Sequence, residues 1–387
     1  MTEITIVGAG LFGLTMAQRC AVTGFDVTVI DQRGHIGGNA YSYIDGETGI
    51  EVHPYGTHVF HTSNHRVWDY VNQFTQFYPY RHKVMAMAGG DYYPMPVNLT
   101  TICDVAGLAM TPDEARGWIN RDSTPYIGHG DQISLEDKAM SMVGKRIYDL
   151  LIKNYTKKQW QTDPRDLPAD IINRLPVKYD FDPHYFNDTW EGIPYRGYTA
   201  WFESMVHHPR ITMLLNTEWS SVASSVAGQI PVVYTGPLDQ YFKYSNGHLG
   251  WRSVDFTIER RETSDHQGIA VMNYPDLTVP YTRVHEFKHL RPDLRHQTWS
   301  GDDVTIISYE HPVGVSDDVE PYYPINAVSD RQMLAEYRAL AHAEASRGVF
   351  FGGRLGTYKY LDMHMAVASA LTMAENTVIP HLKGRSS

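Results

Sequence analysis

Hydrophobic and polar positions at the start of the chain predict a strand–helix–strand unit. The stretch TEITIVGAGLFGLTMAQRCAVTGFDVTVID has two short runs rich in Ile and Val on either side of a helical pattern. A turn with three glycines, Gly8-x-Gly10-x-x-Gly13, joins the first run to the helix. We therefore expect a βαβ unit that ends at Asp31.

From about residue 111 the pattern becomes helical. TPDE at Thr111–Glu114 is a capping box with proline at the first helical position. Ser134–Asp137 opens a second helix. Its apolar residues recur at helical spacing: Leu135, Ala139, Met142, Val143, Ile147, Leu150 and Leu151. This helix is expected to run into NYTKKQW at Asn154–Trp160. On an ideal helix Tyr155 and Trp160 lie about 140° apart, so the helix should end between them if both face one ligand.

Strand patterns return later in the chain. SVDFTIERR, GIAVMNY, PYTRVHEFKH and VTIISYE favour strands between residues 250 and 310. IPVVYTGP and GVFFGGRLG add strands to the first unit, and MHMAVASALTMA is an apolar helix. The expected fold class is mixed α/β (α+β). It comprises a discontinuous Rossmann-type domain at 1–83, 208–248 and 318–387, a helical domain at 84–165, and a mobile lid with an antiparallel sheet at 166–207 and 249–317.

Composition and charge exclude several classes of protein. Of 387 residues, 42% are apolar and 20% are charged, which is typical of a soluble globular protein. The formal charge of −11 argues against nucleic acid as a partner. Cys20 and Cys103, without a CxxC, indicate neither a disulfide framework nor a cysteine metal site. No signal peptide is evident and no apolar run approaches the roughly 20 residues of a membrane span, so we expect a cytoplasmic protein.

The glycine turn has the full context of a dinucleotide site. It follows a strand, opens a helix, and has Asp31 downstream. The glycines allow backbone to approach a pyrophosphate, the helix N-terminus offers N–H donors, and Asp31 can accept from ribose hydroxyls. DQRGHIGGNA resembles the acid, arginine and Gly-Gly element of FAD proteins of the glutathione-reductase type, and this resemblance implies FAD rather than NAD. Gly37 and Gly38 would let a second loop close on the cofactor.

Two further features favour FAD without a nicotinamide partner. Gly352–Arg354 precedes a helix that starts near Met363, and the N-terminus of that helix would stabilise negative charge on a reduced flavin. The sequence holds no second GxGxxG, so a separate NAD(P)H domain is not expected.

HEFKH at His285–His289 matches the HExxH pattern of zinc proteases in the wrong context. Zinc binding needs both histidines on one helix face. Pro280 and Pro292 leave little room for a helix, and on a strand the two histidines would lie about 13 Å apart. We therefore expect no metal site.

Blocks along the chain resemble bacterial UDP-galactopyranose mutases, most closely the actinobacterial branch. They cover about residues 3–380 in order: GAGLFG, HIGGNAYS, YGTHVFHTSN, VWDYV, YTKKQW, RLPVKYDFD, YFND, VVYTGPLDQYF, VPYTRVHEFKH, EPYYPIN and FGGRLGTYKYLDMHMA. The resemblance implies a homodimeric FAD enzyme that interconverts UDP-galactopyranose and UDP-galactofuranose without net redox change, to supply galactofuranose for cell-envelope glycans. In that family N5 of the reduced flavin attacks the anomeric carbon and expels UDP, and the sugar then recloses on another hydroxyl.

The resemblance also implies a set of site residues. The expected catalytic residues are Arg174 and Arg283, which hold the pyrophosphate, and His58, which packs near the flavin. The expected substrate-binding residues are Leu151, Tyr155, Thr156, Trp160, Tyr185, Asn273, Tyr323, Tyr360 and His82. The expected cofactor-binding residues are Gly8, Gly10, Phe12, Gly13, Asp31, Gly38, Asn39, Thr57, His58, Arg354, Leu361, Asp362 and Met363.

A few positions depart from the family pattern. Pro54 and Thr57 stand in PYGTH, where KYGAH is common, His82 stands where some members have asparagine, and Asp31 replaces a more frequent glutamate. These positions leave the sugar open, so a mutase for another nucleotide-sugar is an alternative. A flavin amine oxidase would need an apolar tunnel in place of the two arginines. A non-catalytic flavin or nucleotide sensor is disfavoured because both arginines are retained.

Overall fold

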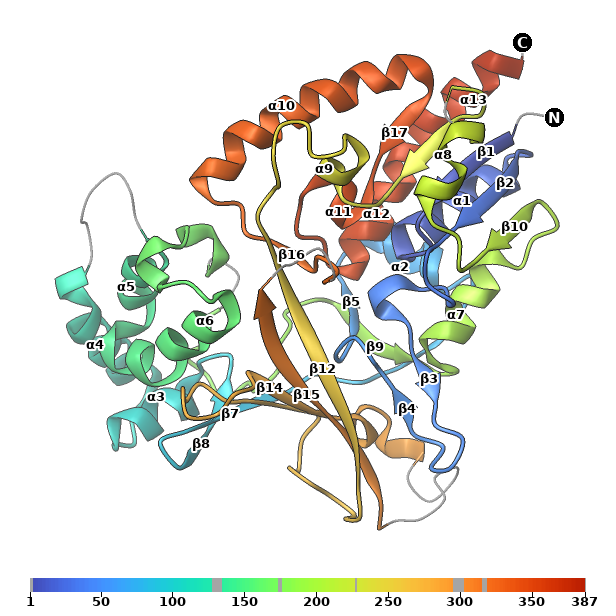
Figure 1. The fold of residues 1–387 in the computed structure, drawn as a ribbon. Coiled ribbons are helices and arrows are strands. Elements are labelled where there is room, and N and C mark those ends of the chain that lie inside the picture. Colours follow the sequence, from blue (N-terminus) through green and yellow to red (C-terminus); the bar gives the residue numbers. More distant parts are fainter. Residues whose placement is uncertain are drawn as a thin grey trace.

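The computed structural model describes residues 3–126, 134–172, 176–226, 228–294, 303–314 and 319–386. A parallel sheet with its helices, a larger antiparallel sheet and a group of helices beside that larger sheet make up the molecule (Figure 1).

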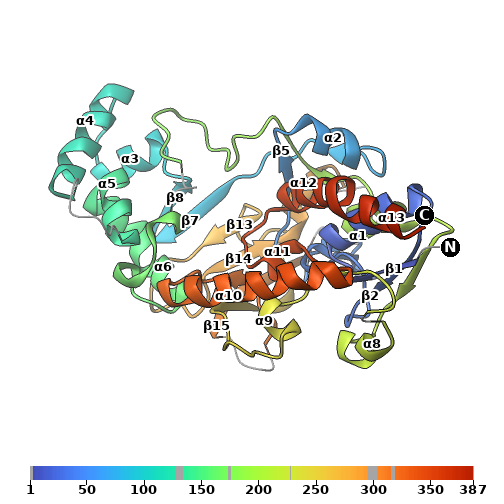
Figure 2. The same cartoon turned by 90° about the horizontal axis from the view of Figure 1, so that it is seen from above.

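The parallel sheet confirms the expected βαβ unit and its assembly from distant parts of the chain. Its strand order is β10 (Ile211–Leu214), β2 (Asp26–Ile30), β1 (Glu3–Val7), β11 (Val232–Tyr234) and β17 (Val349–Phe351). On one face α1 (Leu11–Val22) packs against α12 (Met363–Met373), and α8 (Trp219–Val226) packs on the other (Figure 2). This is a Rossmann-type arrangement, in which ligands bind at the carboxyl ends of the strands.

The seven-stranded sheet forms the centre of the molecule. Its order is β16 (Tyr323–Pro324), β12 (Trp251–Arg261), β15 (Thr305–Gly314), β14 (Arg283–Glu286), β13 (Val271–Asn273), β7 (Val84–Ala88) and β8 (Asp91–Met95). All pairs are antiparallel except β13 with β7. Strands therefore form in all four stretches expected between residues 250 and 310. The expectation that PYTRVHEFKH is extended as far as His289 is wrong, because β14 ends at Glu286 and Phe287–Leu290 form a 3-10 turn. Residues 84–95 were expected in the helical domain, and that expectation is wrong. Burial alternates along β7, which places every second side chain in the core, as in a strand.

Four helices pack at the far end of this sheet. They are α3 (Leu99–Ala106), α4 (Pro112–Ser123), α5 (Leu135–Ile147) and α6 (Lys153–Trp160). The capping boxes at Thr111 and Ser134 form as expected. The backbone of α5 breaks at Gly144, where φ is 76°. Glycine is required there because a Cβ would lie 2.4 Å from Asp122 Oδ2. A wider π-type turn at Tyr148–Ile152 then leads into α6.

Residues 190–206, expected in the unit that combines the lid with the antiparallel sheet, contribute to the core. Residues 190–206 form β9 (Trp190–Pro194), which pairs with β5 (Phe60–Thr62) and β6 (Phe77–Tyr78), and α7 (Gly197–Val206), which packs against α1. Trp201 and Phe202 are fully buried there. Large apolar side chains anchor this segment to α1, while its strand β9 belongs to an antiparallel sheet.

The remaining elements are short or peripheral. They are β3 (Tyr43–Ile44), β4 (Glu51–Val52), α2 (His65–Val71), α9 (Leu238–Tyr241), α10 (Val328–Glu344), α11 (Gly353–Thr357) and α13 (Ile379–Ser386). None of the helices within the described ranges combines the length and the apolarity that crossing a membrane requires.

Candidate active site

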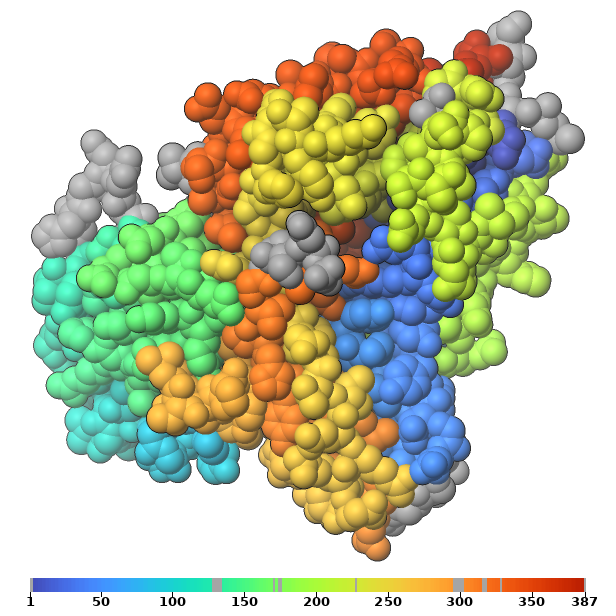
Figure 3. Space-filling model, in the orientation of Figure 1, coloured from blue at the N-terminus to red at the C-terminus, as the bar shows by residue number. Residues whose placement is uncertain are grey.

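One cavity of about 2080 Å³ joins the parallel sheet to the helices. Ordinary small-molecule sites occupy about 300–1,000 Å³, so this cavity has room for two ligands. The molecular surface is hollowed between the yellow segment near α9 and the blue N-terminal segment (Figure 3). All the expected cofactor- and substrate-binding residues line it, together with Arg283 and His58. Arg174 lies outside the described residues.

The first glycine turn forms a tight backbone cradle at one end of the cavity. Gly8 N donates to Ile30 O at 2.8 Å, which closes the turn onto β2. A Cβ on Gly13 would lie 2.0 Å from Gly8 O, and one on Gly8 would lie 2.0 Å from Thr235 Oγ1. No side chain fits at either position. The cavity-facing surface is therefore bare backbone at the N-terminus of α1, which suits a pyrophosphate.

A second loop closes on the first, as expected from the paired glycines. Gly37 N donates to Ala9 O at 2.8 Å, and a Cβ on Gly38 would lie 3.0 Å from Gly10 Cα. The Asp31 carboxylate accepts from Ala9 N at 2.7 Å and from Arg33 N at 2.8 Å, which fixes it at the end of β2. These groups fit the phosphates and ribose of a dinucleotide.

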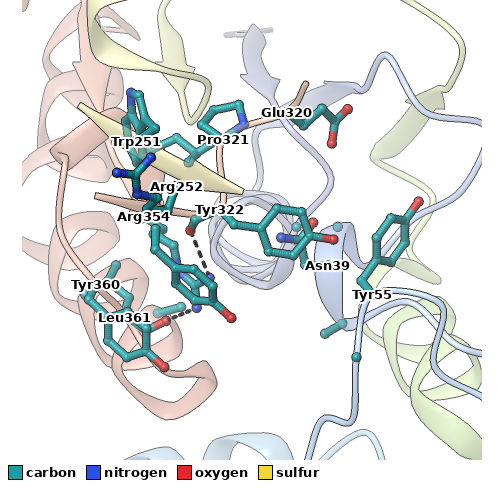
Figure 4. Close-up of a pocket in the computed structure, with 18 of the residues that line it drawn as sticks. Asn39, Tyr55, Trp251, Arg252, Glu320, Pro321, Tyr322, Arg354, Tyr360 and Leu361 are labelled. Atoms are coloured by element: carbon teal, nitrogen blue, oxygen red, sulfur yellow. Dashed lines mark hydrogen bonds between the residues drawn. The ribbon is translucent and has the colours of Figure 1, made fainter. Parts of the chain in front are cut away.

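The C-terminal segment supplies another wall of the cavity. Arg354 donates from Nη1 to Tyr322 O at 3.3 Å and from Nη2 to Leu361 O at 2.7 Å (Figure 4). Its guanidinium carbon lies 5.5 Å and 5.0 Å from the ring centroids of Tyr323 and Tyr360. Arg354 thus holds the chain just ahead of the N-terminus of α12, which faces the cavity through Asp362.

His58 is a neutral histidine in the wall of the cavity. Its Nδ1 lies 2.7 Å from Gly56 O. Burial lowers the pKa of His58 to about 4, although the Gly56 carbonyl opposes the shift. Because a carbonyl only accepts, the proton sits on Nδ1, which leaves Nε2 with a free lone pair.

The opposite end of the cavity is lined by α6. The expectation that this helix ends between Tyr155 and Trp160 is wrong, because it continues through Trp160 and is capped by Gln161, where φ is 47°. Both aromatics still line the cavity, and Gln159 and Thr156 fill the arc of about 140° between them, so they belong to one broad face.

Several polar atoms at this end have no hydrogen-bond partner among the residues that the structure describes. They are Tyr155 Oη, Gln159 Oε1 and, on β13, Asn273 Oδ1, all buried. Buried polar groups are usually hydrogen-bonded, so these three oxygens are suited to a polar ligand.

A buried charge cluster lies beside these groups. Arg283 Nη1 donates to Glu310 Oε2 at 3.3 Å, and its guanidinium carbon lies 5.6 Å from the Tyr155 ring centroid. His285 hydrogen-bonds with Thr57 Oγ1 at 2.9 Å and with Glu310 Oε2 at 3.3 Å. Burial alone would raise the pKa of Glu310, but Arg283 and His285 lower it to about 2. Arg283 is therefore a fixed cation in the cavity wall.

Sequence reasoning missed two members of this cluster. His285 drew attention only through the HExxH pattern, in which His289 instead hydrogen-bonds with Asp265 at 3.2 Å. Glu310 carried no local signal, since its partners lie 25 and 27 residues away along the chain.

Another missed group lies on β5 and the segment before β9. His61 Nδ1 lies 2.6 Å from Asp188 Oδ2, and the His61 ring stacks on Phe186 with centroids 3.7 Å apart. His61, Asp362 and His364 have side-chain ligand atoms within 4.8 Å of one another, as do Asp265, Glu286 and His289. By spacing alone both groups would admit an ion.

His82 lies in the same wall with a buried acid behind it. Its backbone N donates to Glu191 Oε1. Burial lowers the pKa of His82 to about 3, so its ring is neutral. Its Nδ1 lies 3.2 Å from the Tyr80 hydroxyl.

Comparisons with known proteins agree on one family. A family model described as UDP-galactopyranose mutase matches residues 150–360, and one for an NAD(P)-binding Rossmann-like domain matches residues 6–74. A probable UDP-galactopyranose mutase of Klebsiella pneumoniae is 39% identical over 373 residues, which cover 96% of this chain and 94% of that protein. A dTDP-fucopyranose mutase of Escherichia coli is 37% identical over 381 residues, which cover 97% of this chain and 98% of that protein.

A solved structure supports the fold. The crystal structure of a reduced UDP-galactopyranose mutase superposes with a TM-score of 0.75 at 14% identity, covering 100% of this chain and 96% of that one. The actinobacterial affinity stays a prediction. The family model spans more than half of the chain and the two relatives span nearly all of it, so this chain belongs to the UDP-galactopyranose mutase family.

Proposed function

We propose that this protein interconverts UDP-galactopyranose and UDP-galactofuranose with reduced FAD. Membership of the family makes it a nucleotide-sugar mutase with a flavin-binding Rossmann-like domain. We propose in addition that its sugar is galactose, that its nucleotide is UDP and that its flavin acts in the reduced state. The observation that supports it is a single cavity that joins the glycine cradle to the α6 face and Arg283.

The residues at the α6 end would bind the nucleotide. The Tyr155 ring offers a face for uracil, and such stacking is worth about 1–3 kcal/mol per base. The three unpartnered oxygens of Tyr155, Gln159 and Asn273 can accept from N–H and O–H donors. A ribose carries one more hydroxyl donor than a deoxyribose, which favours a uridine over a thymidine ligand.

The charged residues would stabilise the leaving group. Bound reduced FAD supplies the nucleophile for the anomeric carbon. Glu310 holds the Arg283 guanidinium in place through a hydrogen bond. The guanidinium fork of Arg283 fits a diphosphate whose charge grows as the sugar–oxygen bond breaks. Arg174, outside the described residues, is the proposed second cation. His58 holds its proton on Nδ1 and so adds no positive charge near the flavin.

An anaerobic turnover assay tests the proposal. Protein reduced with dithionite is given UDP-galactofuranose, the products are separated by chromatography, and oxidised protein serves as the control. We expect UDP-galactopyranose to form only with reduced protein. No conversion by protein that binds both FAD and UDP would exclude the galactose assignment.

A second candidate is a dTDP-fucopyranose mutase, because the Escherichia coli relative with that activity is 37% identical. The same assay with dTDP-fucofuranose separates the two. If kcat/KM for the dTDP-sugar exceeds that for the UDP-sugar, the second candidate replaces the first.

A further inference from the structure

One lysine ties the loop between β13 and β14 to α6. Lys158 Nζ donates to three backbone carbonyls of this loop, Asp276 O at 2.9 Å, Val279 O at 2.9 Å and Tyr281 O at 2.7 Å. An ammonium has three N–H donors, so the loop uses all of them. Burial lowers the pKa of Lys158 to about 8, partly offset by Asp276, so the ammonium is still protonated near neutral pH.

The loop has little regular structure of its own. Residues 274–282 connect a strand of three residues to one of four. Pro275 and Pro280 have no N–H to donate. The bonds within the loop are local, from Thr278 N to Asp276 Oδ1 at 2.9 Å and from Tyr274 N to Thr282 O at 2.9 Å. Lys158 therefore sets how the loop lies against the helix.

Both ends of this loop carry residues of the cavity wall. Asn273 is the last residue of β13, Arg283 is the first of β14, and the two are opposite each other in the sheet. Tyr155, on the same helix as Lys158, faces Arg283. A shift of the loop relative to α6 would move Asn273 and Arg283 away from Tyr155 together.

We propose that Lys158 is a positioning residue for nucleotide binding. It aligns the strand that bears Arg283 with the aromatic face of α6, and it does not itself line the cavity formed by the described residues. This inference rests on the proposed function, because it assigns the α6 end of the cavity to the nucleotide. Lys157, its exposed neighbour on the same helix, is a matched control.

The test compares K158M with K157M in FAD-loaded protein, with UDP as the probe. Methionine keeps an unbranched stem of similar length and removes the three donors. We expect the Kd for UDP to rise about tenfold or more in K158M, because three charge-assisted hydrogen bonds are lost. We expect KM to rise with Kd while kcat stays within about threefold, as for a loss of uniform binding. FAD content and the K157M affinity should match wild type.

The outcomes separate this inference from the proposed function. A K158M affinity for UDP within about twofold of wild type, or a fall in kcat at unchanged affinity, would overturn the inference. If K158M does not retain FAD, K158R replaces it. A planar guanidinium cannot aim three donors at three converging carbonyls, so weaker UDP binding is expected and wild-type affinity would overturn the proposal. Failure of the wild-type protein to bind UDP would instead count against the proposed function.

Discussion

At the scale of single residues, the ion pair between Arg283 and Glu310 is expected to stabilise the folded protein. Glu310 is 3% exposed, and E310Q would leave the Arg283 guanidinium without its counter-charge. Breaking a fully buried pair costs about 3–5 kcal/mol, and the cost here is smaller because the Arg283 side chain is 30% exposed. We therefore expect E310Q to lower Tm at pH 7 by several degrees in differential scanning fluorimetry.

An exposed ion pair supplies the control for that experiment. Glu47 is 80% exposed and pairs with Arg260, and surface pairs contribute about 0–1 kcal/mol. E47Q should leave Tm nearly unchanged. Equal Tm values for E310Q and E47Q would contradict the importance of the buried pair.

Glu191 makes a prediction about pH. Its side chain is fully buried behind His82, and its Oε2 lies 3.6 Å from Arg81 Nε. Burial raises the pKa of Glu191 to about 7, and the bond from His82 N offsets only part of the shift. A folded-state pKa above the usual 4.5 means that the protonated acid is the form the fold favours. Its contribution to stability is therefore complete below pH 4.5 and is lost as the pH rises through about 7.

The measurement is Tm against pH for wild type and E191Q. Glutamine resembles the protonated acid at every pH. We expect the two curves to differ by a constant amount at low pH and the wild-type curve to fall relative to E191Q as the pH rises towards 8. Parallel curves over the whole range would show that Glu191 does not titrate in this window.

At the residue scale, a short sequence pattern predicted the backbone geometry of the first glycine turn. Gly8 and Gly13 of the first turn are recognisable because a side chain at either position would clash with neighbouring atoms. Tyr155 and Arg283 line the cavity as expected from a family resemblance. Glu310 could not be found in this way, because its importance comes from the pairing of β14 with β15, which places it opposite Arg283.

At the scale of elements, local signals located the helices better than they located sheet neighbours. Thr111 and Ser134 mark their helix starts because a cap is satisfied within four residues. Residues 84–95 join the central sheet through a parallel pairing with residues 271–273, far along the chain. No local pattern encodes such a partner, so these residues were expected in the wrong unit.

The glycine turn gives a prediction at the same scale. In G13A the new Cβ would lie 2.0 Å from Gly8 O, so α1 must move away from β1 and distort the cradle. Overpacking of this kind costs about 1–3 kcal/mol or more. We expect purified G13A to lose most of its bound flavin, measured by absorbance after denaturation. G46A is the matched control, because a Cβ at Gly46 would meet nothing within 4 Å. Flavin content equal to wild type in G13A would show that the turn tolerates a side chain.

At the scale of the whole molecule, the cavity lies where the parallel sheet, the seven-stranded sheet and the helices meet. The proposed nucleotide contacts come from α6 and from β13 and β14, so UDP would connect elements that are otherwise joined by few anchors such as Lys158. A ligand that binds only the folded state adds stability by mass action, about 2.7 kcal/mol at a concentration of 100 times Kd. UDP should therefore raise Tm of the FAD-loaded protein.

Arg283 tests whether this gain depends on the proposed geometry. Lysine in R283K keeps the positive charge that Glu310 needs, but its ammonium cannot grip a diphosphate with two parallel bonds. We expect R283K to match the wild-type Tm within a few degrees without UDP and to show a much smaller rise at the same UDP concentration. Uridine alone, which lacks the diphosphate, should affect both proteins equally. If UDP stabilises R283K as much as wild type, the diphosphate does not bind at Arg283, and the nucleotide must be placed elsewhere in the cavity.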